Sequence, residues 1–197
     1  MTDAFAPLVR RYRDAHSPTL DINWALLRLL DRPLCEQLTT DLRSEGGPWE
    51  VHVATERTWE VVPEEPGLYA FLWRPPFAFD VAENKRPGDL AQVLYVGKAG
   101  ASDSGQPTTG NLRQRYKEYV KYVRGDPEVL WKGNEPRTRV QLLGRYLTLR
   151  PLEYWFTVVP RHSEIPHLED RLIKLLNPPC NLQRLPRLVS LPAERAF

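Results

Sequence analysis

Two short apolar segments, each with a tyrosine close to a glycine, constrain this chain more than any other feature. They are GLYAFLW at residues 67–73 and QVLYVG at residues 92–97. Their apolar and aromatic content predicts two strands of one small sheet. Tyr69 and Tyr95 would each stand on a sheet surface beside a glycine that leaves the hydroxyl open. Either tyrosine taken alone is better explained as an ordinary core residue.

Strict alternation predicts which side chains share a face of each strand. In the first segment it separates two sets, which are Leu68, Ala70 and Leu72 on one face and Tyr69, Phe71 and Trp73 on the other. In the second segment it places Val93, Tyr95 and Gly97 together, with Leu94 and Val96 on the opposite face.

Bulk properties limit the chain to a small number of protein classes. Its 197 residues suffice for one well-buried domain plus an appendage, and its 19 prolines predict loop-rich connections. Cys35 and Cys180 form no CxxC pair, so neither a zinc site nor a disulfide framework is indicated. Without an apolar run of membrane length or the apolar core of a signal peptide, the sequence predicts a cytoplasmic protein with no membrane partner.

Charge is unevenly distributed along the chain. Residues 1–97 contain 10 Lys and Arg against 15 Asp and Glu, whereas residues 98–150 contain 11 against 5. A polyanion would therefore bind the middle of the chain. A basic segment by itself can equally be a solvated face, so this distribution is only weak support for a nucleic-acid partner.

The first 60 residues are predicted to be a helical extension. Residues 4–15 and 21–43 have helical patterns, with Asp21 as a candidate N-cap and Pro33 breaking or restarting the second helix. Residues 49–53 and 59–62 are predicted to be short strands leading into the next domain. The extension is expected to pack on that domain, with a dimer surface or a DNA clamp as the alternative.

The middle of the chain is predicted to leave the sheet and return to it through a helix. The proline-rich segment 74–91 is too polar for a tight turn, and residues 99–110 form a loop of small residues. A helix is then expected from a cap at Thr109 or Asn111 to Gly125. One face of that helix would carry an arginine among apolar and aromatic residues, which are Leu112, Arg115, Tyr119 and Tyr122.

Glu169 is the most informative single residue of the C-terminal part. Residues 153–159 have strand composition, and the following segment is predicted to be a helix capped by Ser163. Glu169 lies four residues after Ile165 and four before Ile173, within the apolar stripe of that helix. A carboxylate on the core side is costly unless an arginine, a metal ion or hydrogen bonds compensate it.

Taken in order, five blocks of this sequence resemble the GIY-YIG nuclease superfamily. They are GLY at 67–69, YVGKA at 95–99, NLRQR at 111–115, HLEDRLIK at 167–174 and NPPCN at 177–181. The resemblance covers roughly residues 60–183. It implies an α+β fold with a small mixed or antiparallel sheet flanked by helices. The corresponding division is a helical extension at 1–60, a nuclease domain at 61–183 and a tail at 184–197.

The resemblance also implies an active site, whose residues are Tyr69, Tyr95, Lys98, Arg115, Glu169 and Asn181. Glu169 would be the sole protein carboxylate on one Mg²⁺ or Mn²⁺ ion, and Arg115 would hold the scissile phosphate. One tyrosine would deprotonate or orient the attacking water, with Tyr69 favoured over Tyr95. Because a phenol of ordinary pKa is a poor base at neutral pH, neighbouring cations or the metal are expected to lower that pKa. Asn181 would mainly fix its local loop.

Two features set this chain apart from the minimal family pattern. The loop at 99–110 is longer, so Arg115 is assigned by the NLxxR pattern, with Arg113 as the alternative. Where some restriction members carry a histidine one helical turn after the arginine, this chain has Tyr119.

The function implied is a metal-dependent endonuclease of double-stranded DNA in restriction or another defence role, acting as a homodimer on DNA. DNA-binding residues are expected in the basic region, namely Arg113, Lys117, Lys121, Arg124, Lys132, Arg137 and Arg139. The alternatives are a repair or branched-DNA nuclease that a partner targets, and a catalytically silent nucleic-acid-binding module.

Overall fold

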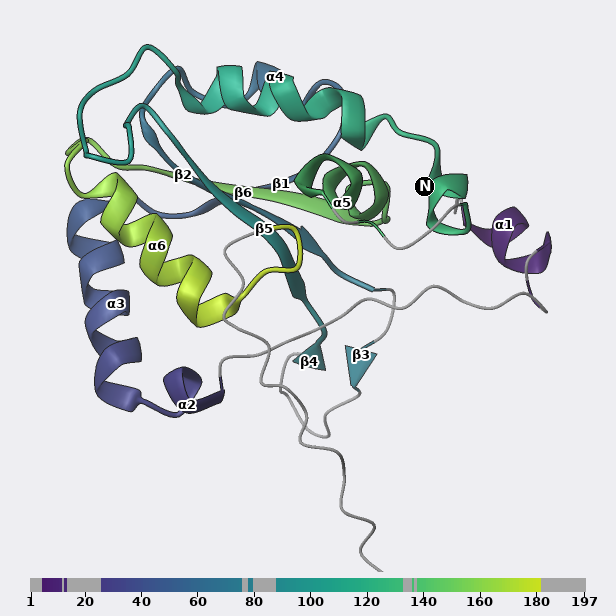
Figure 1. The fold of residues 1–197 in the computed structure, drawn as a ribbon, viewed down its shortest axis with the longest axis horizontal. Helices are drawn as coiled ribbons and strands as arrows, with labels where there is room; N and C mark the ends of the chain where they lie inside the picture. The colour runs from purple at the N-terminus through teal and green to yellow at the C-terminus, as the bar shows by residue number, and fades with distance from the viewer. Residues whose placement is uncertain are drawn as a thin grey trace, which may run out of the picture.

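A four-stranded antiparallel sheet forms the centre of the computed structural model (Figure 1). Its strands lie in the order β1 (Glu50–Val53), β6 (Leu152–Val158), β2 (Gly67–Trp73) and β5 (Gln92–Ala99). The structure describes residues 5–11, 13, 26–75, 78–79, 88–132, 136 and 138–181. The two predicted tyrosine strands, β2 and β5, pair directly, and β5 is an edge strand.

Helices cover both faces of this sheet. Helices α4 (Leu112–Val123) and α5 (Arg139–Tyr146) bury their apolar residues with Tyr69 and Phe71 of β2. Helices α3 (Arg32–Glu45) and α6 (Ile165–Leu176) pack on the opposite face (Figure 1). The predicted α+β architecture with a small sheet flanked by helices is therefore confirmed. The predicted tail at 184–197 lies outside the described residues.

The remaining elements are short and lie in the connections. They are α1 (Ala6–Arg11), α2 (Leu26–Leu29), the 3₁₀ helices η1 (Thr58–Glu60) and η2 (Pro127–Leu130), and the strands β3 (Ala78–Phe79) and β4 (Gly88–Asp89). Strands β3 and β4 pair only with each other. This small separate sheet is consistent with the predicted excursion between β2 and β5.

The predicted alternation holds for β2 but fails in part of β5. The register of the two strands shifts between Phe71 and Leu72, so that Leu72 pairs with Val93 and Leu94 is left as the extra residue of a bulge. Leu94 therefore packs in the same core as Tyr95, whereas Val93 packs on the α6 side. The prediction that Val93 and Tyr95 lie on the same face of their strand was wrong, because strict alternation of side chains cannot anticipate a bulge.

Capping residues explain where helices α3 and α4 start. Asp31 accepts a hydrogen bond from the Leu34 amide, and helix α3 begins at the next residue, Arg32. The chain therefore restarts a helix at Pro33, as predicted. Asn111, one of two predicted caps, accepts from the Gln114 amide at 2.8 Å and starts α4. The predicted cap Asp21 of the N-terminal segment lies outside the described residues.

Two local predictions were wrong. The segment predicted as a strand at 59–62 contains η1, because the Thr58 hydroxyl accepts from the Thr55 amide and donates to the Val53 carbonyl. These local bonds compete with a strand ladder. Ser163 does not cap the last helix, which begins at Ile165. Pro166 lies in the first turn of this helix and has no N–H group that would need a capping partner.

No helix within the described ranges is long and apolar enough to cross a membrane.

Candidate active site

A cleft of about 580 Å³ opens beside β5 and gathers residues from five separate segments. All six residues predicted for the active site line it. The complete lining is Tyr69, Tyr95, Lys98, Asp103, Arg115, Tyr119, Arg139, Pro166, Glu169, Asp170, Ile173 and Asn181. The fold thus brings together residues that are up to 112 positions apart in the sequence, from Tyr69 to Asn181.

The cleft spans the free edge of the sheet. Residues of a strand alternate between its faces, so Tyr95 points toward α4 and α5 while Lys98 points toward α6. Within the described ranges no strand pairs with β5 on its outer side, so groups from both faces can meet around its edge. The α4 and α5 side supplies phenols and arginines, and the α6 side supplies Glu169.

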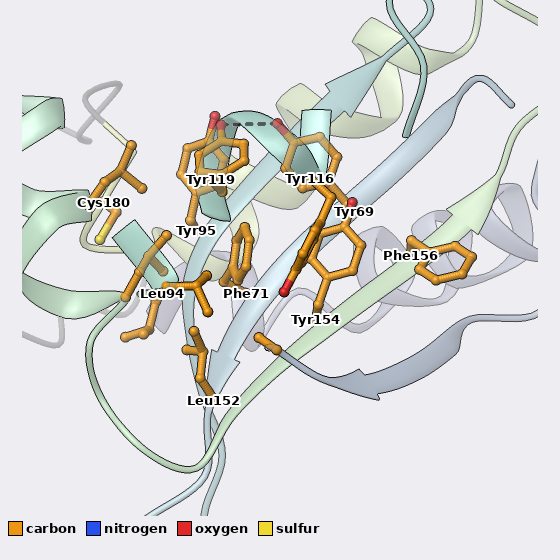
Figure 2. Close-up of a cluster of buried hydrophobic side chains, with 14 of the residues drawn as sticks. Tyr69, Phe71, Leu94, Tyr95, Tyr116, Tyr119, Leu152, Tyr154, Phe156 and Cys180 are labelled. Atoms are coloured by element: carbon orange, nitrogen blue, oxygen red, sulfur yellow. Dashed lines mark hydrogen bonds between the residues drawn. The ribbon is translucent and has the colours of Figure 1, made fainter. Parts of the chain in front are cut away.

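Three tyrosines pack together on the wall of the cleft (Figure 2). The ring centroids of Tyr69, Tyr95 and Tyr119 lie 5.6 to 6.1 Å apart, and the Tyr69 and Tyr119 hydroxyls form a hydrogen bond of 3.1 Å. Tyr69 lies directly over Gly97, where an added Cβ would come within 2.6 Å of the tyrosine oxygen. The glycine of the second segment therefore makes room for the tyrosine of the first. The expectation that the hydroxyl of Tyr69 stays open was wrong, since that side chain is only 2% exposed.

Burial keeps the phenols of Tyr69 and Tyr95 protonated. It raises the pKa of Tyr69 well above the ordinary value of a tyrosine, and it also raises the pKa of Tyr95. Arg139 opposes the rise at Tyr95 without cancelling it. The expectation that neighbouring protein cations lower a tyrosine pKa was therefore wrong for this arrangement, because desolvation outweighs them.

Glu169 projects from α6 into the cleft and meets an ammonium group. Lys98 Nζ lies 2.5 Å from Glu169 Oε2 and 2.6 Å from Asp103 Oδ1. Both Lys98 and Glu169 are 16% exposed at the side chain. Burial raises the pKa of Glu169, and the ion pair with Lys98 pulls it back. Burial also disfavours the charge of Lys98, but its bonds to the two carboxylates outweigh burial and raise the pKa of Lys98.

Arg115 and not Arg113 reaches the cleft. The Arg115 guanidinium pairs with Glu118 at 3.0 Å, and its Nε is buried with no hydrogen-bond partner among the described residues. Arg113 turns away to the Val62 carbonyl and Glu64. A buried donor without a partner is costly, so Arg115 retains capacity to bind an acceptor in the cleft.

Asn181 holds the edge of β5 in place. Its Oδ1 accepts from the Val96 amide at 2.9 Å, and its Nδ2 donates to the Val96 carbonyl at 2.8 Å. Both ends of the side-chain amide are thus committed to backbone. This geometry agrees with the expectation that Asn181 fixes its local loop.

Arg139 is a cleft residue that the sequence placed only among DNA contacts. Thr138 and Gln141 form a capping box at the start of α5, which puts Arg139 in the first turn. Its Nη2 lies 2.5 Å from the Tyr95 hydroxyl and 2.9 Å from the Tyr119 hydroxyl. The capping-box pattern of Thr138 and Gln141 could have located the helix start, but nothing in the sequence indicates the two tyrosine partners.

The other predicted DNA-binding residues contact their own chain. Lys117 lies over the Trp59 ring and Lys121 over the Tyr122 ring, at 4.4 and 4.9 Å from the centroids. Arg124 lies 3.9 Å from Glu56, and Lys132 pairs with Asp126 and Glu128. All four side chains remain on the surface, and Arg137 lies outside the described residues.

A cation would have few protein ligands in this cleft. In the described part of the chain, no three or more His, Cys, Asp or Glu residues group together as a metal site. The donor chemistry that the cleft does offer is Glu169, with Asp103 and Asp170 also in its lining. A small number of carboxylates in a polar cleft suits Mg²⁺, which usually keeps several waters and takes phosphate oxygens as further ligands.

Comparison with known proteins finds no matching family model, no matching curated protein and no matching solved structure.

Proposed function

We propose that this protein is a metal-dependent endonuclease of the GIY-YIG type that hydrolyses phosphodiester bonds in double-stranded DNA, in restriction or another defence role. The observation that carries the proposal is the meeting of Glu169 with three cations and three phenols in a single open cleft, whose lining also includes the carboxylates of Asp103 and Asp170. Hydrolysis of a phosphodiester requires an oriented water and stabilisation of the charge on the phosphate and the leaving oxygen. The cleft contains groups suited to each requirement.

The cations provide the phosphate side of this chemistry. Arg115 has a donor without a partner, and a planar guanidinium matches two phosphate oxygens at once. Lys98 and Arg139 add positive charge within the same cleft. A phosphate that enters the cleft loses hydrating water, and the fixed positive groups would compensate for that loss.

The cleft also fits a divalent ion on Glu169. Lys98 now pairs with this carboxylate at 2.5 Å, so the Glu169 oxygens face a position that a positively charged group occupies. When bound, Mg²⁺ or Mn²⁺ would supply charge stabilisation at the scissile phosphate. Lys98 would then remain bound to Asp103 or move to a phosphate oxygen.

The phenols are assigned to orientation and not to proton removal in their present surroundings. Tyr69 and Tyr95 keep their protons at neutral pH, because burial raises both pKa values. A neutral phenol can accept a hydrogen bond from a water and donate one to a phosphate oxygen. Tyr95 and Tyr69 would therefore orient the attacking water relative to the phosphate that Arg115 binds.

The test is cleavage of supercoiled plasmid by the purified protein with Mg²⁺. Discrete linear fragments are expected from the wild type, and none with EDTA or from Glu169→Gln. The matched control is Glu164→Gln, which alters the acid just before α6 and outside the cleft lining. This control is expected to cut like the wild type.

An inactive wild type on plasmid would exclude the restriction form of the proposal. Nicked, flapped and branched DNA would then be tried, because a repair nuclease acts on those substrates. Activity that survives in Glu169→Gln would contradict the assignment of the carboxylate. Binding without cleavage on every substrate would favour a silent nucleic-acid-binding module.

A further inference from the structure

Arg139 stands apart from the other basic residues of the middle region. It comes from α5, whereas the hydroxyls that it binds belong to β5 and α4. Its guanidinium also lies over the Tyr95 ring, 5.0 Å from the centroid. One side chain therefore contacts Tyr95 through both the hydroxyl and the ring face.

The direction of these hydrogen bonds is fixed by chemistry. A guanidinium has only donors, so the oxygens of Tyr95 and Tyr119 must both accept from Arg139. Each phenol then retains its own proton for another acceptor. Since Tyr119 also bonds to Tyr69, a continuous chain of contacts runs from Arg139 through Tyr119 to Tyr69.

No comparable contact is made by the other arginine of the cleft. Arg115 directs its Nη1 to Glu118, on the next turn of its own helix. Lys98 is committed to Glu169 and Asp103. Among the described residues, Arg139 is thus the charged donor that bonds to Tyr95 and Tyr119, and Tyr69 is connected to it only through Tyr119.

The position of Arg139 requires α5 to be correctly placed. The capping box of Thr138 and Gln141 fixes the first turn of α5, and Leu142, Leu143 and Tyr146 bury the rest of the helix in the aromatic core. The segment before α5 lies in the basic region that was predicted to bind DNA.

We propose that Arg139 is a positioning residue of the candidate active site, which holds the Tyr95 and Tyr119 hydroxyls so that the phenols face the scissile phosphate in one arrangement. This inference rests on the proposed nuclease function. Its alternative is that Arg139 only contributes a phosphate contact and leaves the phenols unaffected.

Kinetics separate the two roles. Arg139→Gln is expected to lower the single-turnover cleavage rate about a hundredfold, the scale of a misplaced reacting group, with less than about a threefold change in Kd for DNA. Arg139→Lys keeps the charge but not the planar fork, so it should restore only part of the rate. Arg43→Gln, an exposed change on α3, is the control and should match the wild type. A phosphate contact alone would instead weaken binding, lower the salt slope by about one and leave the rate unchanged.

A second readout does not depend on cleavage. With ¹³Cζ-labelled tyrosine, the Tyr95 and Tyr119 resonances are assigned from the Tyr→Phe variants and compared between wild type and Arg139→Gln. Both are expected to shift, while Tyr122, whose ring lies near Lys121, should not. Unshifted resonances would overturn the proposal whatever the kinetics show. Shifted resonances in a protein that cuts no DNA would reject the nuclease function and reduce Arg139 to a structural contact.

Discussion

Glu169 is the residue at which the folding and the proposed chemistry of this chain oppose each other. Its helix buries Ile165 and Ile173 on the same side, so the fold places a carboxylate where burial disfavours charge. Lys98 compensates that charge only in part, since the pKa of Glu169 remains above the ordinary value. Such a conflict is typical of functional sites, where a group is retained for its chemistry and not for stability.

The conflict predicts a pH-dependent gain in stability for Glu169→Gln. A raised carboxyl pKa means that Glu169 favours folding while protonated and loses that contribution as the pH rises through its folded pKa. At pH 8 the variant should therefore melt at the same temperature as the wild type or higher, by up to about 4 °C. The difference should vanish toward pH 4, where the carboxyl is protonated in both states. Thermal melts followed by circular dichroism at pH 4.5 to 8 measure it.

A lower melting temperature for Glu169→Gln would be explained by the loss of the ion pair with Lys98. If the variant melts lower than the wild type at pH 8, the ion pair with Lys98 stabilises the fold more than burial of Glu169 destabilises it. Glu164→Gln, on the same chain segment but outside the cleft, controls for the loss of one negative charge.

At the scale of elements, the site depends on how the edge strand β5 is held. An edge strand presents unpaired N–H and C=O groups on its outer side. Here the Asn181 side chain satisfies both groups of Val96, and the Cys180 amide bonds to the Leu94 carbonyl at 2.9 Å. The segment after α6 thus closes the edge of β5 next to Tyr95 and Lys98, which line the cleft.

Asn181→Ala should therefore destabilise the protein and release this edge. Two buried hydrogen bonds are lost and the Val96 backbone groups are left unpaired, which costs about 1–3 kcal/mol for each unsatisfied group. Urea denaturation should show a lower midpoint with an unchanged slope. Native-state hydrogen exchange should show faster exchange at the Val96 amide than global destabilisation alone produces.

The control for this variant is Asn111→Ala, which removes the α4 cap bond to the Gln114 amide. It should cost about 1 kcal/mol and leave the Val96 amide exchanging only through global unfolding. Equal local exchange at Val96 in both variants would show that Asn181 does not close the strand edge.

Local patterns predicted most elements of this fold, and tertiary contacts decided the rest. The cap at Asn111, the helix restart at Pro33 and the apolar stripe around Glu169 depend on neighbours within a few residues, so the sequence reveals them. The bulge at Leu94 arises from pairing with β2 and has no local signature. The same limit explains Arg139, whose tyrosine partners lie 44 and 20 residues away.

At the scale of the whole molecule, the cleft has one Glu169 and therefore one proposed metal carboxylate per chain. One such site can hydrolyse one strand of DNA at a time. Cleavage of both strands in one binding event would require two clefts, and so two chains on the same DNA. The proposed function therefore predicts that two chains act together on DNA.

Mixing wild type with Glu169→Gln tests the dimer. With a large excess of the variant at a fixed amount of wild type, most active chains should lie in mixed dimers, each with one working cleft. Supercoiled plasmid should then accumulate as nicked circles, whereas wild type alone should give linear DNA directly. If the chains act as independent monomers, nicked circles should precede linear DNA with wild type alone. The variant would then slow both steps equally by competing for DNA, and the ratio of nicked to linear product at equal extents of reaction would not change.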